Sequence, residues 1–112
     1  MKVRNYKTAG GKDLIFEYID KLSADERADG FSVIDKLEQE RFEELTIKPW
    51  RGKISEVYFY KHNRMFYVIV EGEIIYLLHA CRKQKNKTEQ GDAEKVISRA
   101  KKLGEELSKK FI

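Results

Sequence analysis

Three runs of β-branched and aromatic residues, separated by two turn signals, dominate the middle of the chain. They span residues 55–61, 65–70 and 74–79, with turns at His62-Asn63 and Glu71-Gly72. Asn and Gly tolerate the positive φ that short hairpin turns require. The stretch therefore predicts a three-stranded antiparallel meander, which runs directly into a basic segment at residues 82–87.

Two helices are predicted before the meander. Residues 13–22 carry apolar side chains at helical spacing behind Asp13, a favourable N-cap residue. A second helix begins at Ser23, which forms a capping-box pattern with Glu26, and its apolar stripe extends to Leu45. We expect an antiparallel helix pair over one face of the sheet. Its carboxylates form a solvated outer surface, and no histidine is interleaved to make a metal site.

The remaining segments predict one strand, one connector and one helix. Residues 1–7 alternate weakly and indicate a first strand that joins the sheet. Residues 47–54 contain the only proline and are interpreted as a connector, in which Trp50 either stacks on a base or fills the edge of the core. A stripe of apolar residues over 89–110 predicts a closing helix with Thr88 as its N-cap.

The charge of the chain is strongly divided along its length. Residues 13–46 hold eleven acidic and four basic side chains, whereas residues 79–112 hold ten basic and five acidic ones. This division favours an anionic partner over a basic surface that merely confers solubility. A single cysteine excludes an internal disulfide, and no run is long and apolar enough to span a membrane, so we expect one cytoplasmic domain without a membrane contact.

The series NRMFYVIVEGEIIYLLHACRKQKNKT resembles the HigB branch of the RelE/ParE toxin superfamily, including its phage-encoded relatives. The matching positions are Arg64, Phe66, Tyr67, Leu77, Leu78, His79, Lys83, Lys87 and Thr88. The sequence departs from the family pattern at Tyr58, Asn63, Cys81 and Glu89. The resemblance implies an α+β protein with the RelE-like microbial RNase fold. Its small antiparallel sheet consists of the N-terminal strand and the meander, with an N-terminal helix pair and a C-terminal helix, in a single domain over residues 1–112.

The resemblance also implies a function. Such proteins are toxins of type II toxin–antitoxin systems that enter the ribosome and cleave mRNA as endoribonucleases, without a metal or other cofactor. A cognate antitoxin neutralises them, often a helix-turn-helix protein of the HigA type, and the complex of the two is oligomeric. The family's functional positions correspond to Arg64, Arg82 and Lys83 in this sequence.

The residues themselves agree with RNA cleavage. The chain has no HExxH, glycine-rich phosphate loop, G-x-S-x-G or CxxC motif, which disfavours metal-assisted and nucleotide hydrolysis. Cations held by a rigid sheet stabilise the charge that builds on a phosphate attacked by the ribose 2′-OH, and histidine suits the proton transfers. The candidate catalytic residues are Arg64, Arg82, Lys83, His62 and His79. The candidate RNA-binding residues are Arg51, Lys53, Lys61, Lys85 and Lys87.

Each candidate has a purely structural alternative. Arg64 can be a cross-strand ion-pair partner, His79 a hydrogen-bonded core histidine, and His62 an inert turn residue. The basic run after the meander can be a solvated loop. Tyr58 and Tyr67 lie on strands, where half of the side chains face the core.

Two other functions compete with mRNA cleavage. A ParE-like relative inhibits an enzyme such as gyrase through protein contacts without cutting RNA, and fold alone does not separate the two activities. An inactive phage-derived relative is the third possibility. For either toxin, the acidic helix pair or the closing helix is the expected docking surface for the antitoxin.

Overall fold

The computed structural model describes residues 1–83 and 88–112 of the chain and shows an α+β fold. The elements are β1 (Lys2–Asn5), α1 (Leu14–Asp20), α2 (Ala24–Glu38), the short 3-10 helix η1 (Phe42–Glu44), β2 (Ile47–Arg51), β3 (Ile54–Phe59), β4 (Asn63–Val70), β5 (Ile74–Arg82) and α3 (Gln90–Leu107). The expected fold class is therefore confirmed. None of the helices in the described residues is long and apolar enough to cross a membrane.

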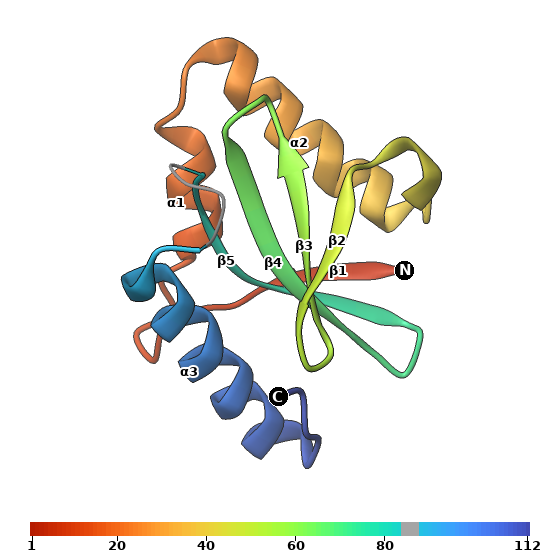
Figure 1. Cartoon of the computed structure of the whole chain (residues 1–112), viewed down its shortest axis with the longest axis vertical. Coiled ribbons are helices and arrows are strands. Elements are labelled where there is room, and N and C mark those ends of the chain that lie inside the picture. The colour runs from red at the N-terminus through yellow and green to blue at the C-terminus, as the bar shows by residue number, and fades with distance from the viewer. Residues whose placement is uncertain (84–87) are drawn as a thin grey trace.

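The strands form one five-stranded sheet in the order β1-β5-β4-β3-β2 (Figure 1). The predicted meander is β3-β4-β5, and within it β4 pairs antiparallel with both β3 and β5. β1 joins β5 in parallel, so the first strand does extend the sheet but makes it mixed instead of purely antiparallel.

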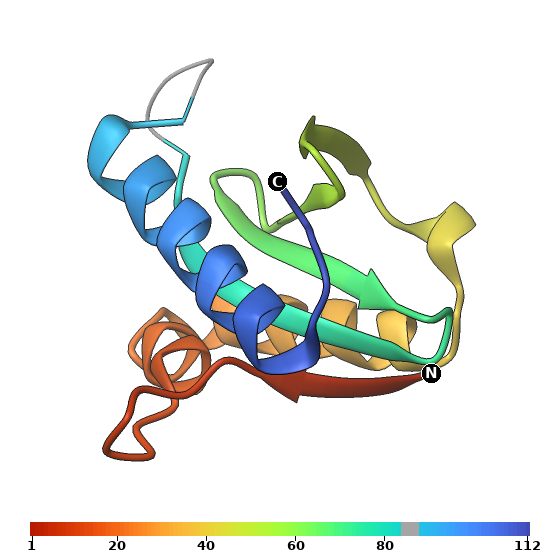
Figure 2. The same ribbon diagram turned by 90° about the horizontal axis from the view of Figure 1, so that it is seen from below.

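Helices cover both faces of the sheet, as Figure 2 shows. α1 and α2 share a core with one face, and the residues buried there include Ile15, Ile19, Val33, Leu37, Val57, Phe59, Met65, Tyr67, Ile75 and Leu77. α3 shares a second core with the other face through Val96, Ala100, Leu103, Phe66, Val68 and Leu78. The helix pair over one face is as predicted.

The caps of the first two helices are also as predicted. The Asp13 carboxylate accepts a hydrogen bond from the N–H of Phe16 at 2.9 Å, and Ser23 Oγ accepts one from the N–H of Glu26 at 3.4 Å. The N-cap of α3 is Glu89 and not Thr88, whose hydroxyl instead accepts a bond from the Trp50 indole at 3.0 Å. The predicted capping role of Thr88 was wrong.

Two further expectations, the length of the second helix and the connector after it, were wrong. The stripe to Leu45 does not belong to one helix, because α2 ends at Glu38 and Glu40 has a φ of 58°. Residues 47–51 form the edge strand β2 and not a connector, and an edge position tolerates Pro49 because its missing N–H faces away from the ladder.

The first hairpin turn lies two residues earlier than expected. Tyr60 and Lys61 carry positive φ values of 36° and 61°, and the strand resumes at Asn63. Asn63 is therefore buried within β4, where its side-chain oxygen accepts a hydrogen bond from Tyr18 at 2.6 Å. The second turn, with positive φ at Glu71 and Gly72, lies where the sequence predicted it.

The arrangement leaves part of the sheet without a helical cover. α3 lies alongside β5, whereas the C-terminal residues reach the β2–β3 turn, where the Phe111 carbonyl accepts a bond from Lys53 N–H at 2.7 Å (Figures 1 and 2). β3 also runs past the start of β2, because Ile47 pairs with Val57 and Tyr58 has beside it only Thr46, which precedes β2 and whose carbonyl accepts the Tyr58 N–H at 3.0 Å. Side chains at this end of β3 can therefore meet a ligand.

Candidate nucleic-acid interface

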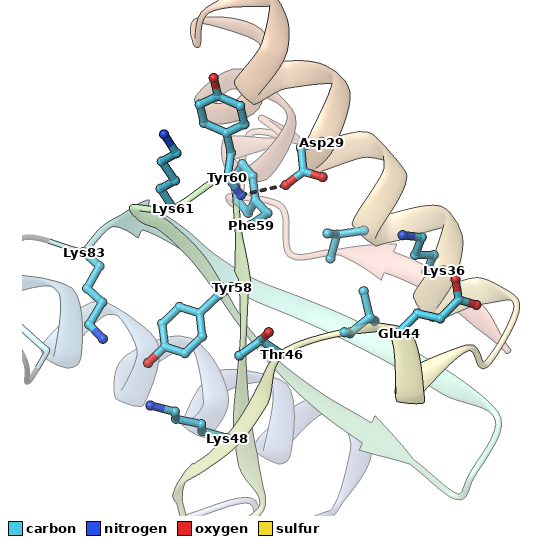
Figure 3. Close-up of a pocket in the computed structure, with 12 residues that line it drawn as sticks. Asp29, Lys36, Glu44, Thr46, Lys48, Tyr58, Phe59, Tyr60, Lys61 and Lys83 are labelled. Atoms are coloured by element: carbon cyan, nitrogen blue, oxygen red, sulfur yellow. Dashed lines mark hydrogen bonds between the residues drawn. The ribbon is translucent and has the colours of Figure 1, made fainter.

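A tyrosine and two lysines meet at the uncovered end of β3. The ammonium of Lys83 lies 4.8 Å from the ring centroid of Tyr58, and that of Lys48 lies 5.3 Å from it. Lys48 comes from the edge strand β2, and Lys83 follows the last residue of β5. Figure 3 shows both ammoniums beside the tyrosine ring. Neither makes an ion pair with any residue that the structure describes.

A buried ion pair lies behind this tyrosine. The Tyr58 hydroxyl donates to Glu56 Oε1 at 2.8 Å, and Arg64 Nη1 donates to Glu56 Oε2 at 3.1 Å. Tyr58 and Arg64 face each other in the β3–β4 register, and Glu56 faces Lys48 in the β2–β3 register. The carboxylate therefore links the sheet core to the surface cluster. We call Lys48, Glu56, Tyr58, Arg64 and Lys83 the Tyr58 cluster.

The electrostatics of the cluster keep the phenol protonated. Burial, together with the hydrogen bond and charge of Glu56, raises the pKa of Tyr58 above its ordinary value of 10. A neutral phenol can act as a general acid only if its hydroxyl turns from Glu56 toward the leaving oxygen. The two ammoniums can stabilise negative charge on phosphoryl oxygens next to it.

Arg64 lies deeper than its predicted role requires. Its exposed fraction is 1%, its guanidinium lies over the Phe66 ring at 5.4 Å, and Nε and Nη2 have no hydrogen-bond partner among the described residues. The alternative of a cross-strand ion pair is thus the arrangement observed. A contact between Arg64 and a phosphate would require its side chain to leave Glu56 and the core.

Arg82 lies away from the cluster. Its guanidinium Nη2 is 3.2 Å from Glu26 on α2, which covers the opposite face of the sheet. Of the three positions that the family resemblance identifies, Arg64 lies beside Tyr58 but is buried, and only Lys83 combines this position with partial exposure. The three side chains therefore do not converge on one surface site.

His62 lies next to the exit of β5. Its carbonyl oxygen accepts a hydrogen bond from the Lys83 N–H, and Asn63 pairs with Arg82 in the next register position. The imidazole is exposed and makes no side-chain hydrogen bond within the described part of the chain. Its ring nitrogens are accordingly accessible to a ligand.

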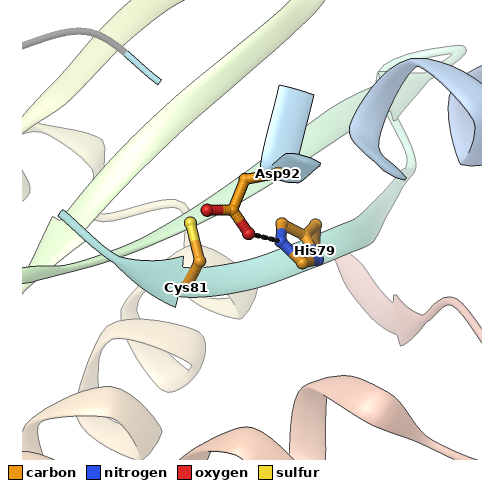
Figure 4. Close-up of side chains that lie close together, drawn as sticks. All are labelled: His79, Cys81 and Asp92. Carbon is orange, nitrogen blue, oxygen red and sulfur yellow. Dashed lines mark hydrogen bonds and ion pairs between the residues drawn. The ribbon is translucent and has the colours of Figure 1, made fainter. Parts of the chain in front are cut away.

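His79, in contrast, has both ring nitrogens engaged. Nε2 lies 2.7 Å from Asp92 Oδ1 (Figure 4). Nδ1 lies 3.0 Å from Arg99 Nη1, which also donates to the Leu78 carbonyl at 2.9 Å. A guanidinium can only donate, so Nδ1 accepts and Nε2 carries the proton toward Asp92. Burial lowers the pKa of His79 against the opposing effect of Asp92. These contacts describe a neutral core histidine that attaches α3 to the sheet.

The same region contains one group of three potential metal ligands among residues 1–83 and 88–112. Ligand atoms of His79, Cys81 and Asp92 lie within 4.8 Å of one another (Figure 4). Burial, and then the nearby Asp92, raises the pKa of the Cys81 thiol to about 11. A metal would have to displace protons from this thiol and from Nε2, next to the Arg99 guanidinium. The donor set therefore fits a cation poorly.

The predicted RNA-binding residues are distributed over two places. Arg51 lies over the Trp50 ring at 4.7 Å and Lys53 is in the β2–β3 turn, at the far end of the hairpin from Tyr58. Lys61 is exposed in the β3–β4 turn. Trp50 packs edge-on against Phe66 with ring centroids 5.0 Å apart, which places it at the core edge. Lys85 and Lys87 lie outside the described residues.

Sequence reasoning missed Lys48 and Glu56. Because residues 47–51 were interpreted as a connector, Lys48 was not assigned to a face of the sheet. Glu56 precedes Tyr58 by two residues, and this period-two spacing places both on one face of a strand. The signal for Glu56 was therefore present in the sequence.

Comparison with known families agrees with this architecture. The family model described as Phage derived protein Gp49-like (DUF891) matches residues 17–101, which include α2, the four strands β2 to β5 and the whole Tyr58 cluster. Comparison with curated proteins found no match. The chain therefore belongs to the Gp49-like family of phage-derived proteins, a toxin-like family related to RelE and HigB.

Proposed function

We propose that this protein is the toxin of a type II toxin–antitoxin system and acts as a metal-independent endoribonuclease that cleaves mRNA on the ribosome. Membership of a toxin-like family supports the first part. The observation that carries the second part is the Tyr58 cluster, in which two ammoniums without an ion-pair partner among the described residues flank a hydrogen-bonded phenol.

In the proposed reaction the ribose 2′-OH attacks the adjacent phosphorus atom. The 2′-oxygen loses its proton to a base, the bond from phosphorus to the 5′-oxygen breaks, and the products are a 2′,3′-cyclic phosphate and a 5′-hydroxyl. Lys48 and Lys83 stabilise the charge on the phosphoryl oxygens, and the Tyr58 hydroxyl turns from Glu56 toward the leaving 5′-oxygen and donates its proton to it. DNA lacks the attacking hydroxyl, which restricts the reaction to RNA.

The other candidates take different parts in this proposal. The exposed imidazole of His62 is our candidate for the base that accepts the 2′-OH proton. Arg64 is a positioning residue, because it holds Glu56, which in turn orients the Tyr58 hydroxyl. We assign no chemical step to Arg82 or His79, whose side chains are engaged with Glu26 and with Asp92 and Arg99.

The test is cleavage by the purified protein of mRNA on programmed ribosomes and, in parallel, of free RNA. We expect cleavage by the wild type, and a loss of about 10²–10⁴-fold in Tyr58→Phe, which removes the general acid and leaves the ring in place. Lys101→Ala, an exposed change on α3, is the control for surface charge. Intact RNA in both arms contradicts the nuclease, as does full activity of Tyr58→Phe. Intact RNA together with inhibited supercoiling by gyrase favours the ParE-like activity.

The proposed antitoxin partner docks on the acidic helix pair or on α3. The outer side of the helix pair offers apolar area as well as charge, since Phe16 is 49% exposed and its ring centroid lies 5.9 Å from that of Phe31. Hydrogen exchange of the toxin with and without the co-encoded protein tests this surface. Protection confined to β2 and β3 contradicts it.

A further inference from the structure

A groove begins at the Tyr58 cluster and continues around the free edge of the sheet. It has a volume of ≈ 500 Å³ and extends from the β3–β4 turn to the C-terminal part of α2 and η1 (Figure 3). That volume is within the range of about 300–1,000 Å³ found for small-molecule sites, so the groove can hold a nucleotide-sized group. Its lining residues are Asp29, Val33, Lys36, Glu44, Leu45, Thr46, Lys48, Tyr58, Phe59, Tyr60, Lys61 and Lys83.

The groove is positively charged in balance, because four lysines line it against two carboxylates. Both of its carboxylates have partners, since Asp29 accepts the Tyr60 N–H at 2.6 Å and Glu44 pairs with Arg41. Its four lysines, Lys36, Lys48, Lys61 and Lys83, make no ion pair with a described carboxylate. Four unpaired ammoniums along one groove favour an anionic ligand with several charges.

The turn at one end of the groove is held in an unusual conformation. Tyr60 and Lys61 both have positive φ, which costs non-glycine residues energy and persists only where neighbouring groups maintain it. The Asp29 carboxylate provides such support through the Tyr60 N–H. The result places an aromatic ring, 37% exposed, next to a lysine at the edge of the groove.

We propose that this groove binds the single-stranded RNA that flanks the cleaved phosphate. Lys36 and Lys61 contact backbone phosphates, and Tyr60 stacks on a base. The inference rests on the proposed function for the identity of the polymer. It adds residues on α2 and in the β3–β4 turn that take no part in the chemistry.

Single-stranded RNA fits these observations better than an acidic peptide. Sites for single strands combine a basic groove that follows the backbone with exposed aromatic rings on which bases stack. The groove has both features, and it shares Lys48, Tyr58 and Lys83 with the proposed reaction centre. A strand bound at the centre therefore has a continuous path into the groove.

The experiment measures binding of a fluorescein-labelled 2′-O-methyl oligoribonucleotide, which lacks the attacking hydroxyl and stays intact. The double variant Lys36→Ala/Lys61→Ala is compared with Lys101→Ala/Lys102→Ala, which removes two exposed lysines of α3. Losing two phosphate contacts should weaken binding several-fold and reduce the slope of log K against log [salt] by about 1.4. The control pair should bind as the wild type does, and thermal unfolding checks that all the variants are folded.

Three outcomes overturn the groove as an RNA site. They are unchanged affinity and slope in Lys36→Ala/Lys61→Ala, no binding by the wild type, and preferential binding of a polyglutamate peptide that depends on Lys36 and Lys61. The first outcome together with normal cleavage leaves the nuclease proposal standing. Binding that depends on the two lysines, without any cleavage, supports the groove and contradicts the nuclease proposal.

Discussion

Replacing Arg64 with methionine is expected to destabilise the fold strongly. The side chains of Arg64 and Glu56 are 2% and 8% exposed, and their charged atoms are 3.1 Å apart. Methionine fills similar space but leaves the Glu56 carboxylate buried with only the Tyr58 hydroxyl as a partner. Breaking a buried pair from one side costs about 3–5 kcal/mol. That is a large part of the 5–15 kcal/mol by which a domain of this kind is typically stable.

The chain provides a matched control in Arg41→Met. Arg41 and Glu44 also form an ion pair, but their side chains are 48% and 36% exposed. Exposed pairs of this kind contribute little to stability, because water and salt screen them. The comparison therefore separates the effect of burial from the loss of an arginine charge.

Urea unfolding followed by the fluorescence of Trp50 is a suitable assay, since this half-buried ring packs against Phe66 in the α3-side core. With a urea m-value of about 1.5 kcal/mol/M, Arg64→Met should lower the midpoint by about 2–3 M. The double variant Arg64→Met/Glu56→Gln should be less destabilised than the sum of its single changes, because glutamine removes the buried charge and can still accept the Tyr58 hydrogen bond. A midpoint within 0.5 M of the wild type, together with lost cleavage, would refute the positioning role and identify Arg64 as a substrate ligand.

Three further predictions concern packing, pH and thiol reactivity. Gly30→Ala should lower the free energy of unfolding, because the new Cβ lies 3.0 Å from the Phe59 ring and 3.2 Å from Ile19. Overpacking costs about 1–3 kcal/mol and outweighs a helix-propensity gain of about 1 kcal/mol. A raised urea midpoint would contradict this prediction. Burial lowers the pKa of His79 below 6.5 in the folded state, so the unfolded chain binds more protons at mildly acidic pH. The stability that the neutral imidazole contributes is complete above pH 6.5 and is lost as the pH falls through the folded-state pKa. The difference in unfolding free energy between the wild type and His79→Gln should therefore shrink over that range. The Cys81 thiol, with a pKa of about 11, should react with iodoacetamide much more slowly in the native protein than in urea at pH 8, and equal rates would show that the site is open.

The sequence identified most of the fold because its strongest signals are local. Period-two runs with β-branched residues predicted the meander, and side-chain caps predicted the starts of both N-terminal helices. The turn at Tyr60-Lys61 was missed because neither residue favours positive φ by itself. Its conformation depends on Asp29, which is 31 residues away. β2 was missed because proline argues against a strand unless the strand is known to lie at the edge of a sheet.

The sequence predicted that the candidate site is basic and aromatic, but it did not predict which residues form it. A basic and aromatic end of the meander was evident from composition, and Lys83 does lie beside Tyr58. Arg82 differs from its neighbour Lys83 because successive side chains near the end of a strand point to opposite faces, and the face that Arg82 reaches bears Glu26 on α2. Which face each residue occupies depends on the registers of β3, β4 and β5, and a bulge between Phe66 and Tyr67 shifts one of these.

The energy of the buried Arg64–Glu56 ion pair also determines what Arg64 contributes to the proposed reaction. A charge-assisted hydrogen bond to a phosphate contributes about 1.5–3 kcal/mol, whereas abandoning Glu56 in the interior costs about 3–5 kcal/mol. A movement of Arg64 from Glu56 to the substrate is therefore unfavourable. Its effect on catalysis must pass through the carboxylate that it holds and the Tyr58 hydroxyl bonded to that carboxylate. In the proposed reaction, Lys48 and Lys83 therefore stabilise the charge on the phosphate. They lose only weak cation–π contacts with the Tyr58 ring when they turn toward a ligand.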